Sequence, residues 1–172
     1  MDFSLSQEHQ SIFEMAYEFG QKQIAPNALA WEKDGTIPKE LWKQAGELGL
    51  GGIYVSEKYG GSGLNRLDAS LIFEAMAMAC PSVSSFLTIH NMCGGMIEKF
   101  GSEELKEKWL PRLCKMEMIF SYCLSEPNSG SDAAALRTKA TKTNEGYYLS
   151  GTKSFISGGG FSDFYLCMVR TG

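Results

Sequence analysis

The hydrophobic periodicity of this chain changes near residue 117. Before that point apolar side chains recur every three or four positions, as in Ile12, Ala16 and Phe19, which places them on one face of a helix. After it, short alternating apolar runs are separated by Gly, Asn and Ser, which is typical of strands joined by turns. We therefore expect a multi-domain α+β chain, with an all-α helical domain over residues 1–117 and a β-domain beginning over residues 118–172.

Capping residues and prolines divide the helical part. Ser4 or Ser6 can cap the first helix, and Pro26 is expected to kink or break it. Pro81 is expected to stop a later helix, and Ser102 can cap the helix that follows Gly101. One apolar face is expected on the helix before Pro81, carrying Leu67, Leu71, Ile72, Ala75, Met78 and Ala79.

Strand signals fill the second part. The segments 137–142 and 147–150 flank Asn144, Glu145 and Gly146, a combination that predicts a hairpin. Further strands are expected at 119–124, 155–157 and 164–169. A few short strands cannot close a barrel and leave unpaired edges, so the β-domain is expected to be truncated at Gly172.

Charge and composition exclude several classes of function. The net charge is −4 and the basic residues are scattered, so no nucleic-acid interface is expected. No apolar run is long enough to cross a bilayer, and no cluster has the spacing of metal ligands, so no membrane or metal partner is expected. The five cysteines form no C-x-x-C pair, which favours free thiols in a reducing compartment. Among them, Cys93 and Cys123 are expected to be buried.

The glycine-rich segment 51–63 has two interpretations. Its glycines suit a plain turn with positive φ angles, or a loop that cradles a phosphate group. It lacks both the G-x-G-x-x-G pattern and the Lys-Ser/Thr pair of a P-loop, which favours the turn.

The segment YCLSEPNSGSDAA at residues 122–134 is the most informative part of the chain. A strand there enters a turn dense in Pro, Asn, Gly and hydroxyl groups. Such a turn can direct backbone N–H groups and Ser hydroxyls at an acceptor-rich ligand such as a pyrophosphate or the polar edge of a flavin. A purely structural Asx or Ser turn is the alternative.

This segment resembles a signature of the acyl-CoA dehydrogenase family, and LSGTKSFISGG at 149–159 resembles a second one. GGSGL at 60–64 is similar to a turn of the same family, and the segments 89–93 and 111–117 resemble its isobutyryl-CoA branch. The resemblance implies that the second domain is the start of an antiparallel β-barrel-like domain. The C-terminal helical domain of the family is absent from these residues.

The resemblance also implies a set of FAD-binding residues: Tyr122, Leu124, Ser125, Gly130, Ser131, Phe155, Ile156 and Ser157. Leu124 and Ser125 would lie at the pyrimidine edge of the flavin, and Gly130 and Ser131 at the pyrophosphate, with Ser131 also facing the thioester substrate. Phe155 would pack on the ring, where many relatives carry Trp. Ser125 stands in place of the commoner Thr, and Asn128 in place of Gly.

The implied reaction is the α,β-dehydrogenation of a short branched acyl-CoA, isobutyryl-CoA to methacrylyl-CoA, in valine breakdown. The base of that reaction comes from the later helical domain, so no catalytic residue is assigned, and Glu126 is interpreted as structural. The resemblance implies a homotetramer that passes electrons to an electron-transfer flavoprotein, in the mitochondrial matrix or a bacterial cytoplasm. The alternatives are a non-catalytic fragment that binds flavin or acyl-CoA, another short-chain acyl-CoA dehydrogenase, and an acyl-CoA oxidase.

Overall fold

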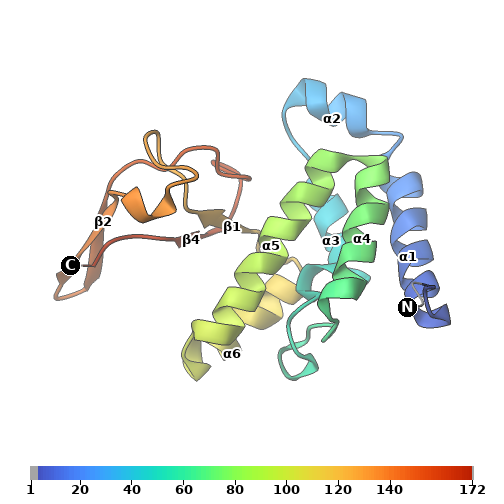
Figure 1. Ribbon diagram of the computed structural model, residues 1–172, viewed down its shortest axis with the longest axis horizontal. Coiled ribbons are helices and arrows are strands. Elements are labelled where there is room, and N and C mark those ends of the chain that lie inside the picture. Colours follow the sequence, from blue (N-terminus) through green and yellow to red (C-terminus); the bar gives the residue numbers. More distant parts are fainter. Residues whose placement is uncertain (1–3, 172) are drawn as a thin grey trace. The chain divides into compact units, whose positions relative to one another are not determined.

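The computed structural model describes residues 4–171, and the chain divides into two compact units between Met118 and Ile119 (Figure 1). The first unit is helical and the second is rich in strands, which confirms the order of fold types expected from the change in periodicity. Each unit has its own internal contacts.

Over residues 4–118 the helical unit contains six α-helices, of which α3 and α4 are joined by a long connection over residues 48–65 (Figure 1). Their bounds are α1 Gln7–Phe19, α2 Ala28–Asp34, α3 Lys39–Glu47, α4 Arg66–Ala79, α5 Pro81–Phe100 and α6 Glu103–Cys114. Helix α4 packs against both α1 and α5, and α5 packs against α6. The core between them contains Trp42, Ile72, Met76, Leu87, Leu110 and Leu113, each of which is almost fully buried.

The helix ends follow local capping chemistry. The Ser6 hydroxyl accepts a hydrogen bond from the His9 amide at 3.2 Å, so Ser6 and not Ser4 is the cap of α1. A π-helical turn over Gly20–Ile24 precedes Pro26, and the chain turns there before α2. Pro81 both follows α4 and opens α5, because a proline is compatible with the first turn of a helix.

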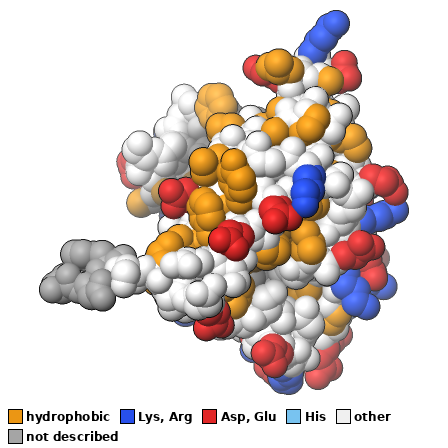
Figure 2. Space-filling view, turned by 90° about the vertical axis from the view of Figure 1, so that its right-hand side faces the viewer, with side chains coloured by type: hydrophobic (Ala, Val, Ile, Leu, Met, Phe, Trp, Pro, Cys, Tyr) orange, Lys and Arg blue, Asp and Glu red, His pale blue; other side chains and the backbone are white. Residues whose placement is uncertain are grey.

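The apolar face expected on α4 is wrong at two positions. Leu67 is 50% exposed and Met78 is 61% exposed, whereas Leu71, Ile72 and Ala75 are buried. Figure 2 shows hydrophobic side chains gathered on one face of the molecule among acidic and basic ones. Because Leu67 and Met78 are exposed, helix α4 carries apolar side chains outside its buried face. Hydrophobic periodicity alone does not distinguish such residues from core residues.

The glycine-rich segment is a turn docked on α5. The amides of Ser62, Gly63 and Leu64 donate to the carbonyls of Gly52, Val55 and Ile53 at 2.8–2.9 Å. These three N–H groups are already bonded to backbone, so they are not available to cradle a phosphate group.

Buried Asn91 on α5 holds the start of this segment. Its side-chain oxygen accepts from the Ile53 amide at 2.7 Å, and its amide nitrogen donates to the Leu50 carbonyl at 2.8 Å and the Leu87 carbonyl at 3.0 Å. One side chain thus satisfies backbone groups of α5 and of the turn.

Over residues 119–171 the β-rich unit contains two separate pairs of strands. Strands β2 (Lys139–Thr143) and β3 (Gly146–Ser150) form the antiparallel hairpin expected from the turn at 144–146. Strands β1 (Phe120–Cys123) and β4 (Phe164–Cys167) pair in parallel, so the expectation of antiparallel strands does not hold for this pair. The long connection between them lets the chain return in the same direction before it pairs.

The segment 155–157 is not a strand. Phe155 has a φ of +58°, which is incompatible with an extended ladder, and the segment is held by bonds outside any sheet. The hydroxyl of Ser121 donates to the carbonyl of Ser157, and Ser121 also lies 2.6 Å from the Ser162 hydroxyl. Side-chain bonds therefore replace strand pairing here.

Candidate functional site

The two signature segments lie side by side in the β-rich unit. The Ser154 amide donates to the Ser125 carbonyl at 2.8 Å, and the Lys153 ammonium donates to the Leu124 carbonyl at 2.9 Å. The turn that leaves β1 and the segment 153–157 are thus bonded to each other through the backbone. This brings Leu124 and Ser125 close to the stretch that carries Phe155.

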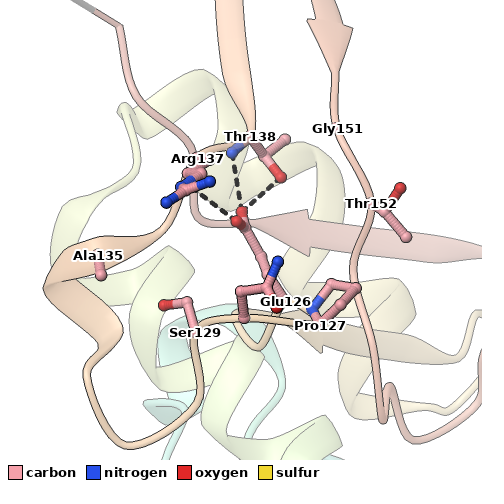
Figure 3. Close-up of a pocket in the computed structure, with 9 residues that line it drawn as sticks. Glu126, Pro127, Ser129, Ala135, Arg137, Thr138, Gly151 and Thr152 are labelled. Atoms are coloured by element: carbon pink, nitrogen blue, oxygen red, sulfur yellow. Dashed lines mark hydrogen bonds between the residues drawn. The ribbon is translucent and has the colours of Figure 1, made fainter.

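Glu126 joins these segments to the start of β2 (Figure 3). Its carboxylate accepts from the Arg137 amide at 2.6 Å, the Thr138 amide at 2.8 Å and the Thr138 hydroxyl at 2.5 Å. Lys153 completes the set, with its ammonium 2.9 Å from the same carboxylate. A buried carboxylate with this many donors is stabilised in its charged form.

These donors set the ionisation of Glu126. The Thr138 hydroxyl, followed by the Arg137 and Thr138 amides and by Lys153, lowers the pKa of Glu126 to about 2, although burial opposes the shift. A general base near neutral pH needs a much higher pKa and a free oxygen. Glu126 therefore has the geometry of an anchor for the loops and not that of a proton acceptor.

The turn after Glu126 leaves part of its backbone open. Glu126 and Ser129 exchange two backbone hydrogen bonds, at 2.8 and 3.1 Å, and the Ser129 hydroxyl donates to the Asp132 carbonyl at 2.7 Å. Gly130 and Ser131 project from this turn and are exposed, and an added Cβ at Gly130 meets nothing within 4 Å. Within residues 4–171, neither of their amides is hydrogen-bonded.

The other expected cofactor residues differ in exposure. Tyr122, Leu124 and Ser125 are half-buried along β1 and its exit, as are Ile156 and Ser157. The Ser125 amide has no hydrogen-bond partner in the described part of the chain, so it is available to a ligand. Phe155, by contrast, is 97% exposed.

Phe155 combines this exposure with a strained backbone. A φ of +58° at a bulky residue is an outlier, and such outliers cluster at ligand-binding sites.

No hydrogen bond joins Gly130 or Ser131 to the segment 153–157 within the described residues, so the two ends of the expected site are connected only through the turn.

A hollow of about 240 Å³ is formed in part by the same turn (Figure 3). It is lined by Glu126, Pro127, Asn128, Ser129, Ala135, Arg137, Thr138, Gly151 and Thr152. None of the expected cofactor residues lines it. The Glu126 carboxylate that lines this hollow already accepts several hydrogen bonds. We therefore interpret the hollow as part of the scaffold that holds the loops.

Sequence reasoning missed the residues that hold the site together. Lys153 and Thr138 lie far from Glu126 in the sequence, and no periodic pattern connects them. The available signal was a pair of opposite charges, Glu126 and Lys153, one in each signature segment.

The described residues contain neither a candidate metal centre nor a candidate membrane span. Among residues 4–171 no three His, Cys, Asp or Glu side chains are grouped so that they could hold a metal ion. No α-helix in the described range has the length and hydropathy needed to span a bilayer. Cys93 and Cys123 are buried, and none of the five cysteines, all of which lie within the described residues, is in a disulfide.

The site suits a flat ligand with a polar edge and an anionic arm. One end of the expected site contains the free Ser125 amide, half-buried apolar residues and the exposed Phe155 ring, and the other contains the open amides of Gly130 and Ser131. These features define a candidate ligand-binding site in the β-rich unit of a chain whose first unit is helical.

The chain belongs to the acyl-CoA dehydrogenase family. The family's N-terminal domain matches residues 6–117, and its middle domain matches residues 121–172. The chain is 53% identical over 168 residues to the mitochondrial isobutyryl-CoA dehydrogenase of Dictyostelium discoideum, a match that covers 98% of this chain and 40% of that protein. It therefore spans less than half the length of this relative.

Solved structures agree with the fold. Butyryl-CoA dehydrogenase from Megasphaera elsdenii superimposes with a TM-score of 0.90 at 37% identity, over 100% of this chain and 46% of that one. The FAD complex of PigA superimposes with a TM-score of 0.91 at 32% identity, again over 100% of this chain and 46% of that one.

Proposed function

We propose that the whole protein catalyses the FAD-dependent α,β-dehydrogenation of a short branched acyl-CoA, with this chain supplying part of the flavin and thioester site. The observation that carries the proposal is the free Ser125 amide on a half-buried turn beside the fully exposed, strained Phe155. A free donor next to an uncovered aromatic ring is what a planar cofactor with a polar edge requires.

Each expected residue has a role that its position supports. Ser125 donates its amide to the polar edge of the ring, and Tyr122 and Leu124 supply the adjoining surface. Gly130 and Ser131 offer amides and a hydroxyl to the pyrophosphate, and Ser131 also faces the thioester.

The second signature segment supplies the other side of the ring. Phe155 covers the ring, and Ile156 and Ser157 lie beside it, with Ser157 directed towards its central nitrogen. When bound, FAD supplies an acceptor for the hydride that leaves the β-carbon of the acyl chain. The residues of this chain hold that acceptor, exclude water and orient the thioester.

We propose that the substrate is isobutyryl-CoA, which the enzyme converts to methacrylyl-CoA in valine breakdown. Support comes from the high identity to an enzyme named for that substrate, compared with the lower identity to butyryl-CoA dehydrogenase. By the same reasoning we propose a homotetramer in the mitochondrial matrix, with an electron-transfer flavoprotein as acceptor. A bacterial cytoplasm is the alternative location.

We also propose a domain division at 117/118, with an N-terminal helical domain followed by the first part of the middle β-domain. The boundaries of the family matches and the division of the chain into units support this placement. The base that removes the α-proton is not assigned to any residue of this chain.

The test is an assay of the protein purified from its natural source. Flavin absorbance that co-purifies with the protein, and bleaches faster with isobutyryl-CoA than with n-butyryl-CoA under anaerobic conditions, is the expected result. Protein without flavin overturns the proposal. Bound flavin that no acyl-CoA bleaches favours the non-catalytic alternative, preference for n-butyryl-CoA favours a sibling enzyme, and rapid reoxidation by oxygen favours an oxidase.

A further inference from the structure

Lys153 belongs to the second signature segment and occupies a protected position against the first. Its side chain is 12% exposed, although a lysine with an unpaired charge is rarely buried to this degree. Its ammonium donates to the Leu124 carbonyl and to the Glu126 carboxylate, each at 2.9 Å. The side chain is therefore fixed at both of its polar contacts.

The contact with Leu124 reaches the candidate cofactor site through one peptide bond. The Leu124 carbonyl and the Ser125 amide belong to the same planar peptide unit. A cation bonded to the carbonyl oxygen draws electron density from that unit and makes its N–H a stronger donor. In the described part of the chain this N–H has no partner, so the effect is available to a ligand.

Glu126 balances the charge of Lys153. Its carboxylate is 7% exposed and is held by Thr138 and by the Arg137 amide, which keeps it ionised beside the ammonium. The pair therefore adds no net charge to the site. Its influence on a ligand passes through the orientation and polarisation of the peptide between Leu124 and Ser125.

We propose that Lys153 is a positioning residue that orients and polarises the Leu124–Ser125 peptide towards the polar edge of the bound flavin, with Glu126 as its counter-ion. This inference rests on the proposed function. Reduction places negative charge on that edge of the ring, so a stronger N–H donor favours the reduced flavin.

The experiment measures the midpoint potential of the bound flavin in the full-length protein. Lys153→Met is expected to shift the equilibrium against reduction by about tenfold, or ~30 mV for a two-electron couple. K153R retains a cation and is expected to recover part of the shift. The matched control, Lys142→Met, removes an exposed lysine from β2 and is expected to leave the potential unchanged.

Glu126→Gln gives a shift of opposite sign. It leaves the Lys153 charge without its counter-ion, so the potential is expected to rise, whereas simple loosening of the loops would lower it in both variants. If K153M does not fold, the sign of the E126Q shift decides: a rise supports the inference, and a fall or no change overturns it.

The outcomes separate this inference from the proposed function. Wild-type protein that binds no flavin overturns both. Wild-type protein that binds flavin, with a K153M variant of unchanged potential, overturns the role of Lys153 alone. A K153M variant with reduced thermal stability and an unchanged potential likewise reduces Lys153 to a structural residue.

Discussion

The amide of Ser154 donates to the carbonyl of Ser125 across 2.8 Å, which joins the two signature segments by a single backbone bond. The contact lies directly beside the free Ser125 amide and the exposed Phe155 ring. Its partners come from distant parts of the sequence, so the candidate site exists only in the folded β-rich unit.

Replacing Ser154 by proline tests this bond, because proline has no amide N–H. We expect flavin affinity to fall by about two- to tenfold, which corresponds to the loss of one hydrogen bond of typical net strength. Ser154→Ala keeps the amide and is the control, with expected affinity close to that of the natural protein. Fluorescence titration of the apoprotein with FAD measures both, and equal affinities would contradict the role of the bond.

The lowered pKa of Glu126 predicts that the local stability around this carboxylate depends on pH. Its folded pKa of about 2 lies below the ordinary value of 4.5, so its stabilising contribution is complete above pH 4.5 and is lost as the pH falls towards 2. Hydrogen exchange at the Arg137 and Thr138 amides should accelerate over this range relative to exposed reference amides. In Glu126→Gln the acceleration should be absent, and a variant that retains it would place the titration elsewhere.

Substitutions of Phe155 are expected to change the stability of the protein and its affinity for FAD in opposite directions. Phe155→Gly should stabilise the free protein by about 1 kcal/mol, because glycine accepts the positive φ that strains phenylalanine, less its own entropic cost. The same variant should bind FAD more weakly because the ring is gone. Phe155→Ala removes the ring without relieving the backbone. Thermal unfolding and FAD titration of both variants give the comparison, and unchanged affinity in both would remove Phe155 from the site.

The close packing around Gly61 predicts that a side chain at this position would clash within the helical unit. A Cβ there would lie 2.0 Å from the Val55 carbonyl oxygen, so Gly61→Ala should destabilise this unit by about 1–3 kcal/mol. Gly95→Ala on α5 is the control, since its nearest neighbour is 3.9 Å away and alanine favours a helix. Tryptophan fluorescence during urea unfolding reports this unit, and a neutral G61A would contradict the observed packing.

Among these variants, we expect a substitution of Asn91 to lower the stability of the helical unit most. Asn91→Leu keeps the size of the side chain but leaves the buried Ile53 amide and Leu50 carbonyl without their partner, which costs about 2–4 kcal/mol. Asn27→Ala, at an exposed position, should change the stability by less than about 0.5 kcal/mol. Urea unfolding followed by tryptophan fluorescence compares the two, and similar values would refute the role assigned to Asn91.

Local chemistry in the sequence determined much of the fold. The caps at Ser6 and Ser102 and the hairpin around residues 144–146 form as expected. Each depends on residues within a few positions of one another, so the pattern and the structure report the same interaction. The family signatures likewise lie in continuous segments, which is why the family could be recognised before the fold was known.

The tertiary structure alone decided how distant segments meet. The parallel pairing of β1 with β4 and the turn at Phe155 depend on the path of the chain between them, which no local pattern encodes. The contact of Lys153 with Leu124 and Glu126 likewise requires the two loops to be packed together. Sequence by itself determined which segments carry the site, whereas the geometry of that site depends on long-range hydrogen bonds that form only when those segments are brought together in the fold.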